Sequence, residues 1–227
     1  MPRIVLTPKG DTYISRRYAD ANFSSKRFLV TGFECWRSNL FKSLIKFENP
    51  ILPDECIFTG ACLKLYVGEV YGKCVPVRVD NITCYFDPKT VTWNTAPNTT
   101  PTSCTFDVHP QNVGGFIEVD ISDLVYGWIR GKIPNHGLAL VGGSCNRDSA
   151  VAFASSNYNA DFAPRLIIEY KTHKCGPCGA TGPTGPAGPA GPPGGAEARR
   201  RGRRPCRGHR GAARGQPYLT VGRSVVA

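Results

Sequence analysis

The chain has 227 residues, of which 41% are apolar and 20% charged, and a formal net charge of +11. No apolar run approaches the roughly eighteen residues that a membrane-spanning helix needs, so the sequence predicts no transmembrane segment. The amino terminus turns polar at Thr7, short of the apolar core of a secretory signal, and we therefore expect a protein made in the cytoplasm without a signal peptide.

Charge and composition divide the chain into three parts: a head (residues 1–174), a stalk (175–194) and a tail (195–227). The head carries 19 Lys and Arg against 16 Asp and Glu, whereas the tail carries nine Arg, no Lys and one acid. Most of the excess positive charge therefore belongs to the tail. The head has the ordinary length of one domain with a single core.

Short runs rich in β-branched and aromatic residues, closed by Gly, Pro, Asn and Asp, dominate the head. They predict about ten strands: Arg3–Thr7, Thr12–Ser15, Phe28–Thr31, Leu40–Phe47, Ala61–Val67, Val75–Asp80, Phe116–Ile121, Gly137–Val141, Val151–Ala154 and Arg165–Tyr170. So many strands with so little helix indicate an all-β fold of two packed sheets. In the run Ala61–Val67 the odd-numbered residues share one face, which we assign to the core, and the even-numbered ones, Cys62, Lys64 and Tyr66, point to solvent or to a neighbouring element.

One short helix interrupts this pattern. Asp123 is placed to cap it, Leu124 and Trp128 lie four residues apart on one stripe, and Gly131 ends it. We expect about two turns.

Two aromatic side chains in polar stretches are candidates for ligand contact. Trp36 and Tyr158 could each offer a sugar an exposed ring on the β-sandwich. Trp128 lies on the helix stripe and Trp93 lies near Val91, so we assign both of these to the core.

Catalytic and metal-binding patterns are missing from the sequence. It holds no nucleophile elbow, P-loop or His-Glu-x-x-His pattern. Helix capping explains Asp120 and Asp123 at least as well as catalysis does. The four histidines fall in separate segments without a second ligand at zinc spacing: His109, His136, His173 and His209. We therefore predict no enzyme activity, no metal site and no cofactor.

Several blocks of the head follow one another in an order found in a known family. They are Asp11–Ser15 with Asn22–Ser25, Ser43–Phe47, Ala61–Val67, Thr90–Asn94, Val119–Ile121 with Leu124–Gly131, Pro134–Leu138, and Phe153–Ser156 with Pro164–Tyr170. Over residues 3–171 this order resembles that of DNRLRE domains. The resemblance implies a jelly-roll β-sandwich similar to carbohydrate-binding modules, found in bacterial and archaeal surface or secreted proteins, with no shared catalytic centre. The seven cysteines of the head exceed the usual load of that family, which favours a structural role over sugar recognition.

The stalk follows a collagen register. Seven glycines recur every third residue, with Pro in many of the intervening positions: Gly176, Gly179, Gly182, Gly185, Gly188, Gly191 and Gly194. Only glycine fits the axis where three polyproline II chains meet, so the register predicts a homotrimer. Six triplets make a weak triple helix. The heads must associate, cysteines must lock the chains, or the natural stalk is longer.

Cys175 and Cys178 flank the start of this register. A Cys-Gly-Pro-Cys sequence is similar to a thioredoxin active site, but no βαβ pattern surrounds it. We favour an interchain disulfide at this junction.

The tail has two interpretations. The three-residue spacing of glycine ends after Gly194, and Ala198–Arg200 is the product of a Gly-Pro-Thr triplet read one base late. The first interpretation is therefore a disordered Arg-rich segment that is translated out of frame. The second is a genuine arm that binds polyanions through its arginines. The head offers no matching basic stripe, which disfavours nucleic acid as a partner.

These parts together resemble proteins of the outermost layers of bacterial spores. We therefore predict a non-catalytic structural protein that displays its head on a trimeric stalk, on a spore surface or a cell surface. The alternatives are a carbohydrate-binding adhesion module that takes a glycan or surface polymer, and a phage tail fibre component.

Overall fold

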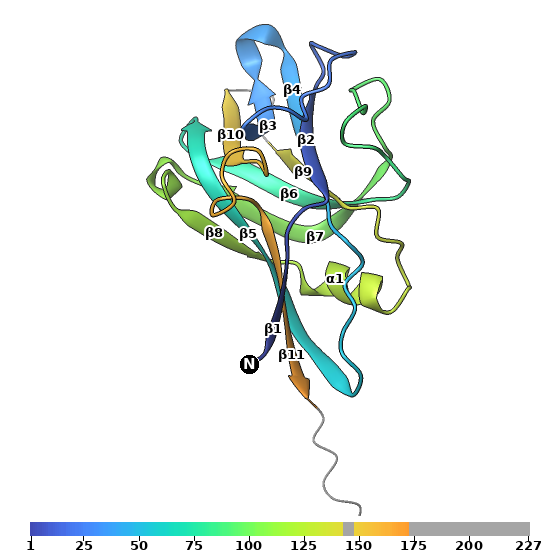
Figure 1. Ribbon diagram of the computed structural model, residues 1–227. Coiled ribbons are helices and arrows are strands. Elements are labelled where there is room, and N and C mark those ends of the chain that lie inside the picture. Colours follow the sequence, from blue (N-terminus) through green and yellow to red (C-terminus); the bar gives the residue numbers. More distant parts are fainter. Residues whose placement is uncertain (143–147, 173–227) are drawn as a thin grey trace, which may run out of the picture. The chain divides into compact units, whose positions relative to one another are not determined.

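Eleven strands and one α-helix make up the part of the chain that the computed structural model describes, residues 1–142 and 148–172 (Figure 1). The strands are β1 (Arg3–Leu6), β2 (Gly10–Ser15), β3 (Phe28–Glu34), β4 (Asn39–Lys46), β5 (Cys56–Tyr71), β6 (Val75–Ile82), β7 (Thr99–Val108), β8 (Phe116–Asp120), β9 (Leu138–Gly142), β10 (Ser149–Ala154) and β11 (Arg165–Thr172). The helix is α1 (Ser122–Ile129).

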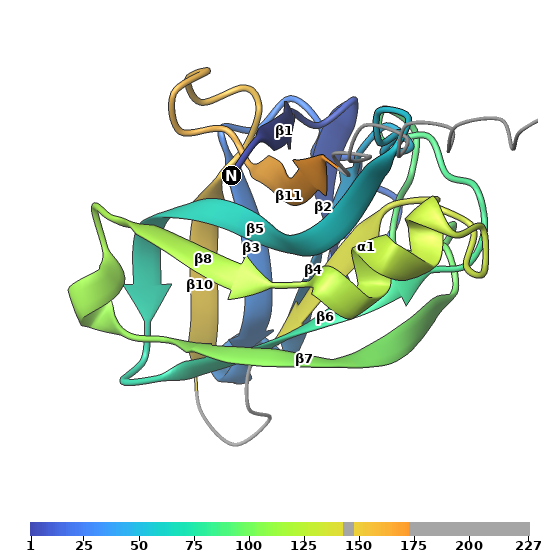
Figure 2. The same cartoon turned by 90° about the horizontal axis from the view of Figure 1, so that it is seen from below.

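Antiparallel pairing joins these strands into one curled sheet that folds over into two layers. The first layer runs β1–β11–β5–β8, and the second runs from β5 through β10–β3–β4–β9–β6–β7, with β2 paired to β4. Figure 2 shows β5 and β8 lying across β3, β4 and β10, on the other side of the core. The all-β sandwich expected from the sequence is confirmed.

Strand β5 belongs to both layers because its pairing changes along its length. Its first part pairs with β11 and β8, and its end pairs with β10. A β-bulge at Gly68, where the register to β10 shifts, separates the two parts. A side chain at Gly68 would collide with Phe28, since an added Cβ would lie 2.4 Å from the Cε1 atom of that ring. The position of the Phe28 ring against β5 therefore favours glycine here.

The main core fills the space between the layers, as the alternation in β5 predicts. Leu63, Leu65 and Val67 are fully buried, and Cys62, Lys64 and Tyr66 alternate with them at half-buried outer positions. Trp128 of α1 is 6% exposed and joins this core. Its indole N–H donates to Oδ1 of Asn81 at 3.0 Å, so the one polar atom of the ring is satisfied.

A second, smaller core lies on the outer side of β2, β4 and β9. The segment between β6 and β7 covers it with Phe86, Val91 and Trp93, which pack over Ile14 and Leu44. The assignment of Trp93 and Trp128 to core clusters is therefore confirmed.

The ten strands expected from the sequence are all present, with ends shifted by a few residues, and an eleventh was missed. β7 is rich in Thr and Ser and contains Pro101, and its sequence predicts no strand here. It pairs with β6 alone and forms the end of the strand order. A strand at an edge tolerates proline and alternates polar with half-buried residues, which explains its weak signal.

The helix begins two residues earlier than a cap at Asp123 predicts. Ile121 holds the N-cap position without a side-chain bond, and Asp123 lies in the first turn. Asp120 acts at this end instead, because its Oδ1 accepts a hydrogen bond from the Ser122 amide at 2.8 Å. Hydrogen bonding from the Ser122 side chain, and then from its amide, lowers the pKa of Asp120. Gly131, at a φ of +65°, follows the last turn as predicted.

Among residues 1–142 and 148–172, no helix has the length and apolarity to cross a membrane. The stalk glycines, Cys175 with Cys178, and the tail lie outside the described residues.

Candidate functional site

Five aromatic rings from four parts of the chain, namely β3, β5, β8 and the β10–β11 loop, meet on the outer face of β5 and β8. We call this cluster the aromatic surface, and its members are Phe28, Tyr66, Phe116, Tyr158 and Phe162. From Phe28 to Tyr158, then Phe162, then Phe116, successive ring centroids lie 5.1, 5.8 and 6.1 Å apart. These spacings are typical of packed aromatic pairs, so the rings form one continuous surface.

Strand register places two of these rings. Tyr66 of β5 and Phe116 of β8 are directly paired, and their rings meet edge to face at 5.3 Å. Both point outward because their neighbours Leu65 and Val119 are buried in the core. Phe116 remains 40% exposed.

The loop between β10 and β11 supplies Tyr158 and Phe162, and hydrogen bonds hold it in place. The Ser155 amide donates to the Arg27 carbonyl at 2.9 Å, and the Asn157 side chain donates to the Ser24 carbonyl at 2.6 Å. The Phe162 amide closes a turn with the Asn159 carbonyl at 3.1 Å. The two rings are therefore positioned before any ligand arrives, which lowers the entropy cost of binding.

Asp11 fixes the same loop from β2. Its carboxylate, 3% exposed, accepts hydrogen bonds from the Ser156 amide at 2.8 Å and the Ser156 hydroxyl at 2.9 Å. Burial raises the pKa of Asp11, and the bonds from Ser156 oppose that rise. A buried acid in this setting connects β2 to the loop rather than performing chemistry.

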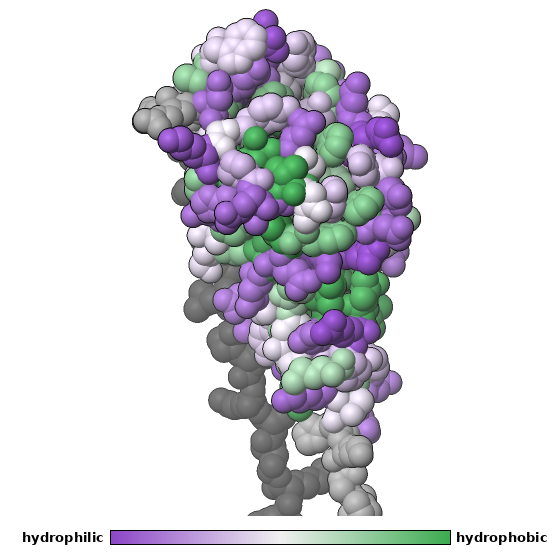
Figure 3. All heavy atoms as spheres, turned by 90° about the vertical axis from the view of Figure 1, so that its left-hand side faces the viewer, coloured by the Kyte–Doolittle hydropathy of each residue, from purple (hydrophilic) through white to green (hydrophobic). Residues whose placement is uncertain are grey.

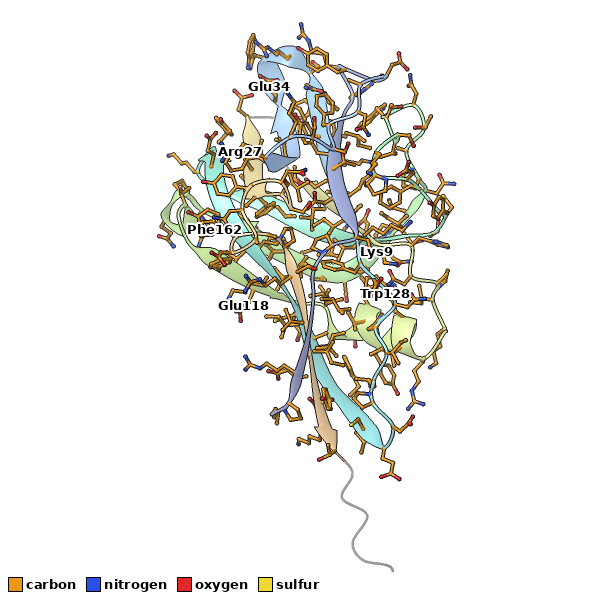
Figure 4. The ribbon with its side chains drawn as sticks, viewed as in Figure 1. Lys9, Arg27, Glu34, Glu118, Trp128 and Phe162 are labelled. Carbon is orange, nitrogen blue, oxygen red and sulfur yellow. The ribbon has the colours of Figure 1, made fainter. Side chains whose placement is uncertain are left out.

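Charged groups border the aromatic surface. The Arg27 guanidinium lies 5.1 Å from the Tyr158 ring centroid, and the Lys64 ammonium lies 4.8 Å from that of Phe116. The Lys64 ammonium also forms an ion pair with Glu118, with 3.0 Å between Nζ and Oε1. Arg27, Phe162 and Glu118 follow one another along the left-hand side of the molecule in Figure 4. Figure 3, which faces that side, shows apolar side chains gathered between hydrophilic ones.

Trp36 lies at a second site, at the tip of the β3–β4 hairpin. It is 68% exposed in a 3₁₀ turn (Cys35–Arg37), and the Arg37 guanidinium covers its ring at 3.8 Å from the centroid. Beside it is a hollow of about 410 Å³, which we call the Trp36 hollow. Its lining residues are Tyr13, Val30, Phe33, Glu34, Trp36, Arg37, Phe41, Tyr71, Asp148 and Ala150.

The structure separates the two ring residues that the sequence singled out. Phe28, beside Tyr158, and Glu34, beside Trp36, are the two ends of β3, which at ~3.3 Å per residue are roughly 20 Å apart. Tyr158 joins four rings that the sequence did not select. Tyr66 was assigned an outward direction by alternation, but only strand register and the return of the loop bring Phe116 and Phe162 beside it.

A β-sandwich with an ordered aromatic surface, bordered by charged groups, has the build of a carbohydrate-binding module. The sequence model of carbohydrate-binding module family 96 matches residues 2–170, and the chain belongs to this family. Among curated proteins, none matches the chain. The family is one of non-catalytic binding modules, which agrees with the absence of catalytic patterns from the sequence.

Proposed function

We propose that the head binds a polysaccharide on the aromatic surface. The observation that carries this proposal is the unbroken row of rings from Phe28 to Phe116, held by paired strands and a hydrogen-bonded loop. Sugar rings present C–H groups on their faces, and these pack against aromatic faces with loss of water from both. Membership of a carbohydrate-binding family supports the same function.

The border of the surface supplies the polar part of recognition. Arg27 and Lys64 are hydrogen-bond donors to hydroxyl or carboxylate oxygens, and Glu118 is an acceptor for hydroxyl groups. The rings thus provide affinity along the sugar chain, and the charged groups select among sugars.

The test is a binding titration of the full chain against a panel of soluble polysaccharides. We expect Tyr158→Ala to weaken binding at least roughly tenfold, as removal of a central aromatic contact does in other interfaces. Tyr85→Ala is the matched control, because Tyr85 is 70% exposed and belongs to neither surface. Equal affinities for wild type and Tyr158→Ala would reject the aromatic surface as the binding site.

For the whole chain we propose display of this head on a trimeric collagen-like stalk at a spore or cell surface, or on a phage tail fibre. The glycine register in the sequence supports it. Sedimentation of the full chain should give the mass of a trimer; single chains alone would contradict the proposal.

A purely structural role is the second candidate. Six cysteines of the described part are free thiols on exposed or half-buried sites, which suits cross-linking between chains. This role would be favoured if no polysaccharide of the panel binds and the chain forms disulfide-linked oligomers under oxidising conditions.

A further inference from the structure

Three metal-ligand side chains meet where the β5–β6 turn reaches the end of β7. They are Cys74, Asp107 and His109, and their ligand atoms all lie within 4.8 Å of one another. We propose that these residues form a binding site for a divalent transition-metal ion, Zn²⁺ in particular. The site is separate from the aromatic surface and shares no residue with it.

Strand register brings these three residues together. Val75 pairs with Val108 and Pro76 with Asp107, so the ladder continues to place Cys74 opposite His109. Val75 and Val108 are fully buried in the core. Their neighbours Cys74, Asp107 and His109 must therefore project from the outer face, with Asp107 at the end of β7 and His109 directly after its last residue.

A backbone contact bears on the histidine nitrogen that is available to a metal. His109 Nδ1 lies 3.3 Å from the Lys73 carbonyl oxygen, and the tautomer protonated at Nδ1 donates to this oxygen and keeps a free lone pair on Nε2. A ligating histidine commonly donates its second N–H to a carbonyl or carboxylate, which fixes the orientation of its ring. The His109 amide also donates to Asn112 Oδ1 at 2.8 Å, which holds the backbone at this position.

The chemistry of the three ligands favours zinc. A thiolate and an imidazole select borderline or soft ions such as Zn²⁺ over Ca²⁺ and Mg²⁺, which prefer oxygen ligands. Thiolate and carboxylate together balance the charge of a divalent ion. Three protein ligands leave a fourth tetrahedral position for water.

Sequence spacing could not reveal this site, because Cys74 directly precedes β6 and His109 directly follows β7, far along the chain. Our expectation that the head lacks a metal site followed from the separate positions of the histidines along the chain. The pairing of β6 with β7 brings the ligands at their ends together without any short-range sequence pattern.

Cobalt substitution tests the proposal with a direct spectroscopic readout. The full chain, reduced and carrying Cys175→Ser and Cys178→Ser so that this thiol pair does not compete, is titrated with Co²⁺ and then with Zn²⁺. We expect a near-ultraviolet thiolate-to-cobalt band and visible bands of a tetrahedral ion, both removed by Zn²⁺. Cys74→Ser should abolish the thiolate band, and His109→Gln should weaken binding at least roughly tenfold, since even changes to supporting residues cost 10–100-fold.

Cys84→Ser is the matched control, because Cys84 is also an exposed free thiol but lies outside the cluster. It should leave the spectrum unchanged. Absence of the bands from wild type, or an equal loss in Cys74→Ser and Cys84→Ser, would overturn the site. Circular dichroism of each variant checks that the sandwich is intact, and polysaccharide binding measured on the same samples reports the proposed function independently.

Discussion

The aromatic surface and the Trp36 hollow both present rings to solvent, but the molecule holds them in different ways. In the aromatic surface each ring packs against at least one other, and two paired strands and a hydrogen-bonded loop fix their positions. Trp36 lies on a hairpin tip, with Arg37 over its exposed ring. The comparison teaches that exposure and a fixed position are separate properties: Trp36 is more exposed than Phe116, but the rings of the aromatic surface are held by more contacts.

The largest stability effect is expected when the loop of the aromatic surface is released. Asp11→Ala removes the acceptor of two hydrogen bonds from Ser156 and should cost about 1–3 kcal/mol of unfolding free energy in urea. Polysaccharide affinity should fall with it, because Tyr158 and Phe162 lose their anchor. Asp161→Ala, an exposed acid of the same loop, should change neither quantity. An Asp11→Ala variant with wild-type stability and affinity would contradict the role of Asp11 in holding the β10–β11 loop at the aromatic surface.

A side chain added at Gly68 of β5 should displace Phe28 and so disturb the aromatic surface. Gly68→Ala places a methyl group against Phe28 and should destabilise the fold by about 1–3 kcal/mol, as overpacking does. Gly60→Ala on the same strand is the control, since its nearest contact would be 3.6 Å away. Urea unfolding measures both. Similar unfolding free energies for the two variants would mean that the Phe28 ring moves aside without destabilising the fold.

The two surfaces can be compared directly by removing one ring from each. Phe162 touches Tyr66, Tyr158 and Phe116, so Phe162→Ala should lower polysaccharide affinity at least roughly tenfold, about 1.4 kcal/mol. Trp36→Ala should lower it by less than about threefold. Titration calorimetry gives both values, and the reverse order would move the binding site to the Trp36 hollow.

The pH dependence of stability should report the burial of Asp11. Its pKa is higher in the folded protein than in the unfolded chain, so the folded state holds the proton more tightly. The stability from this group is therefore complete below the unfolded pKa and declines as pH rises through the folded one. Asp11→Asn should gain stability relative to wild type across that window, measured by urea unfolding at several pH values. If the difference in unfolding free energy between Asp11→Asn and wild type stayed constant with pH, the raised pKa of Asp11 would be refuted.

The smallest effect is expected at the hairpin tip. Arg37 lies 3.7 Å from Glu34 on the surface, and such exposed pairs contribute little, so Arg37→Ala should change stability by less than about 1 kcal/mol. Thermal melts of the variant and wild type measure this. A larger loss would show that the Trp36 hollow is more rigid than its exposure indicates.

The sequence predicts most of the fold because burial imposes a period of two. Leu63, Leu65 and Val67 identify the core face of β5 without any structure. β7 escapes this reasoning, since an edge strand with Pro101 and many hydroxyl side chains needs no apolar face. Asp120, and not Asp123, accepts the hydrogen bond at the start of α1, because the N-cap is Ile121, two residues earlier than predicted.

The candidate site was less predictable than the fold. Trp36 and Tyr158 stand out in polar stretches, but nothing local shows that only Tyr158 has ring neighbours. Phe116 and Phe162 reach it through strand register and a returning loop, and these are contacts between distant parts of the chain. The cluster of Cys74, Asp107 and His109 escaped the sequence for the same reason.

The position of β11 has a mechanical consequence. β11 lies between β1 and β5, with antiparallel hydrogen-bonded ladders on both sides. Tension applied at Thr172 along the strand would load these two ladders in parallel, so that their bonds must slide past one another together instead of opening one at a time. Such a shear arrangement resists pulling far better than an edge strand that peels away, and it makes the last strand of the head a firm point of attachment under load.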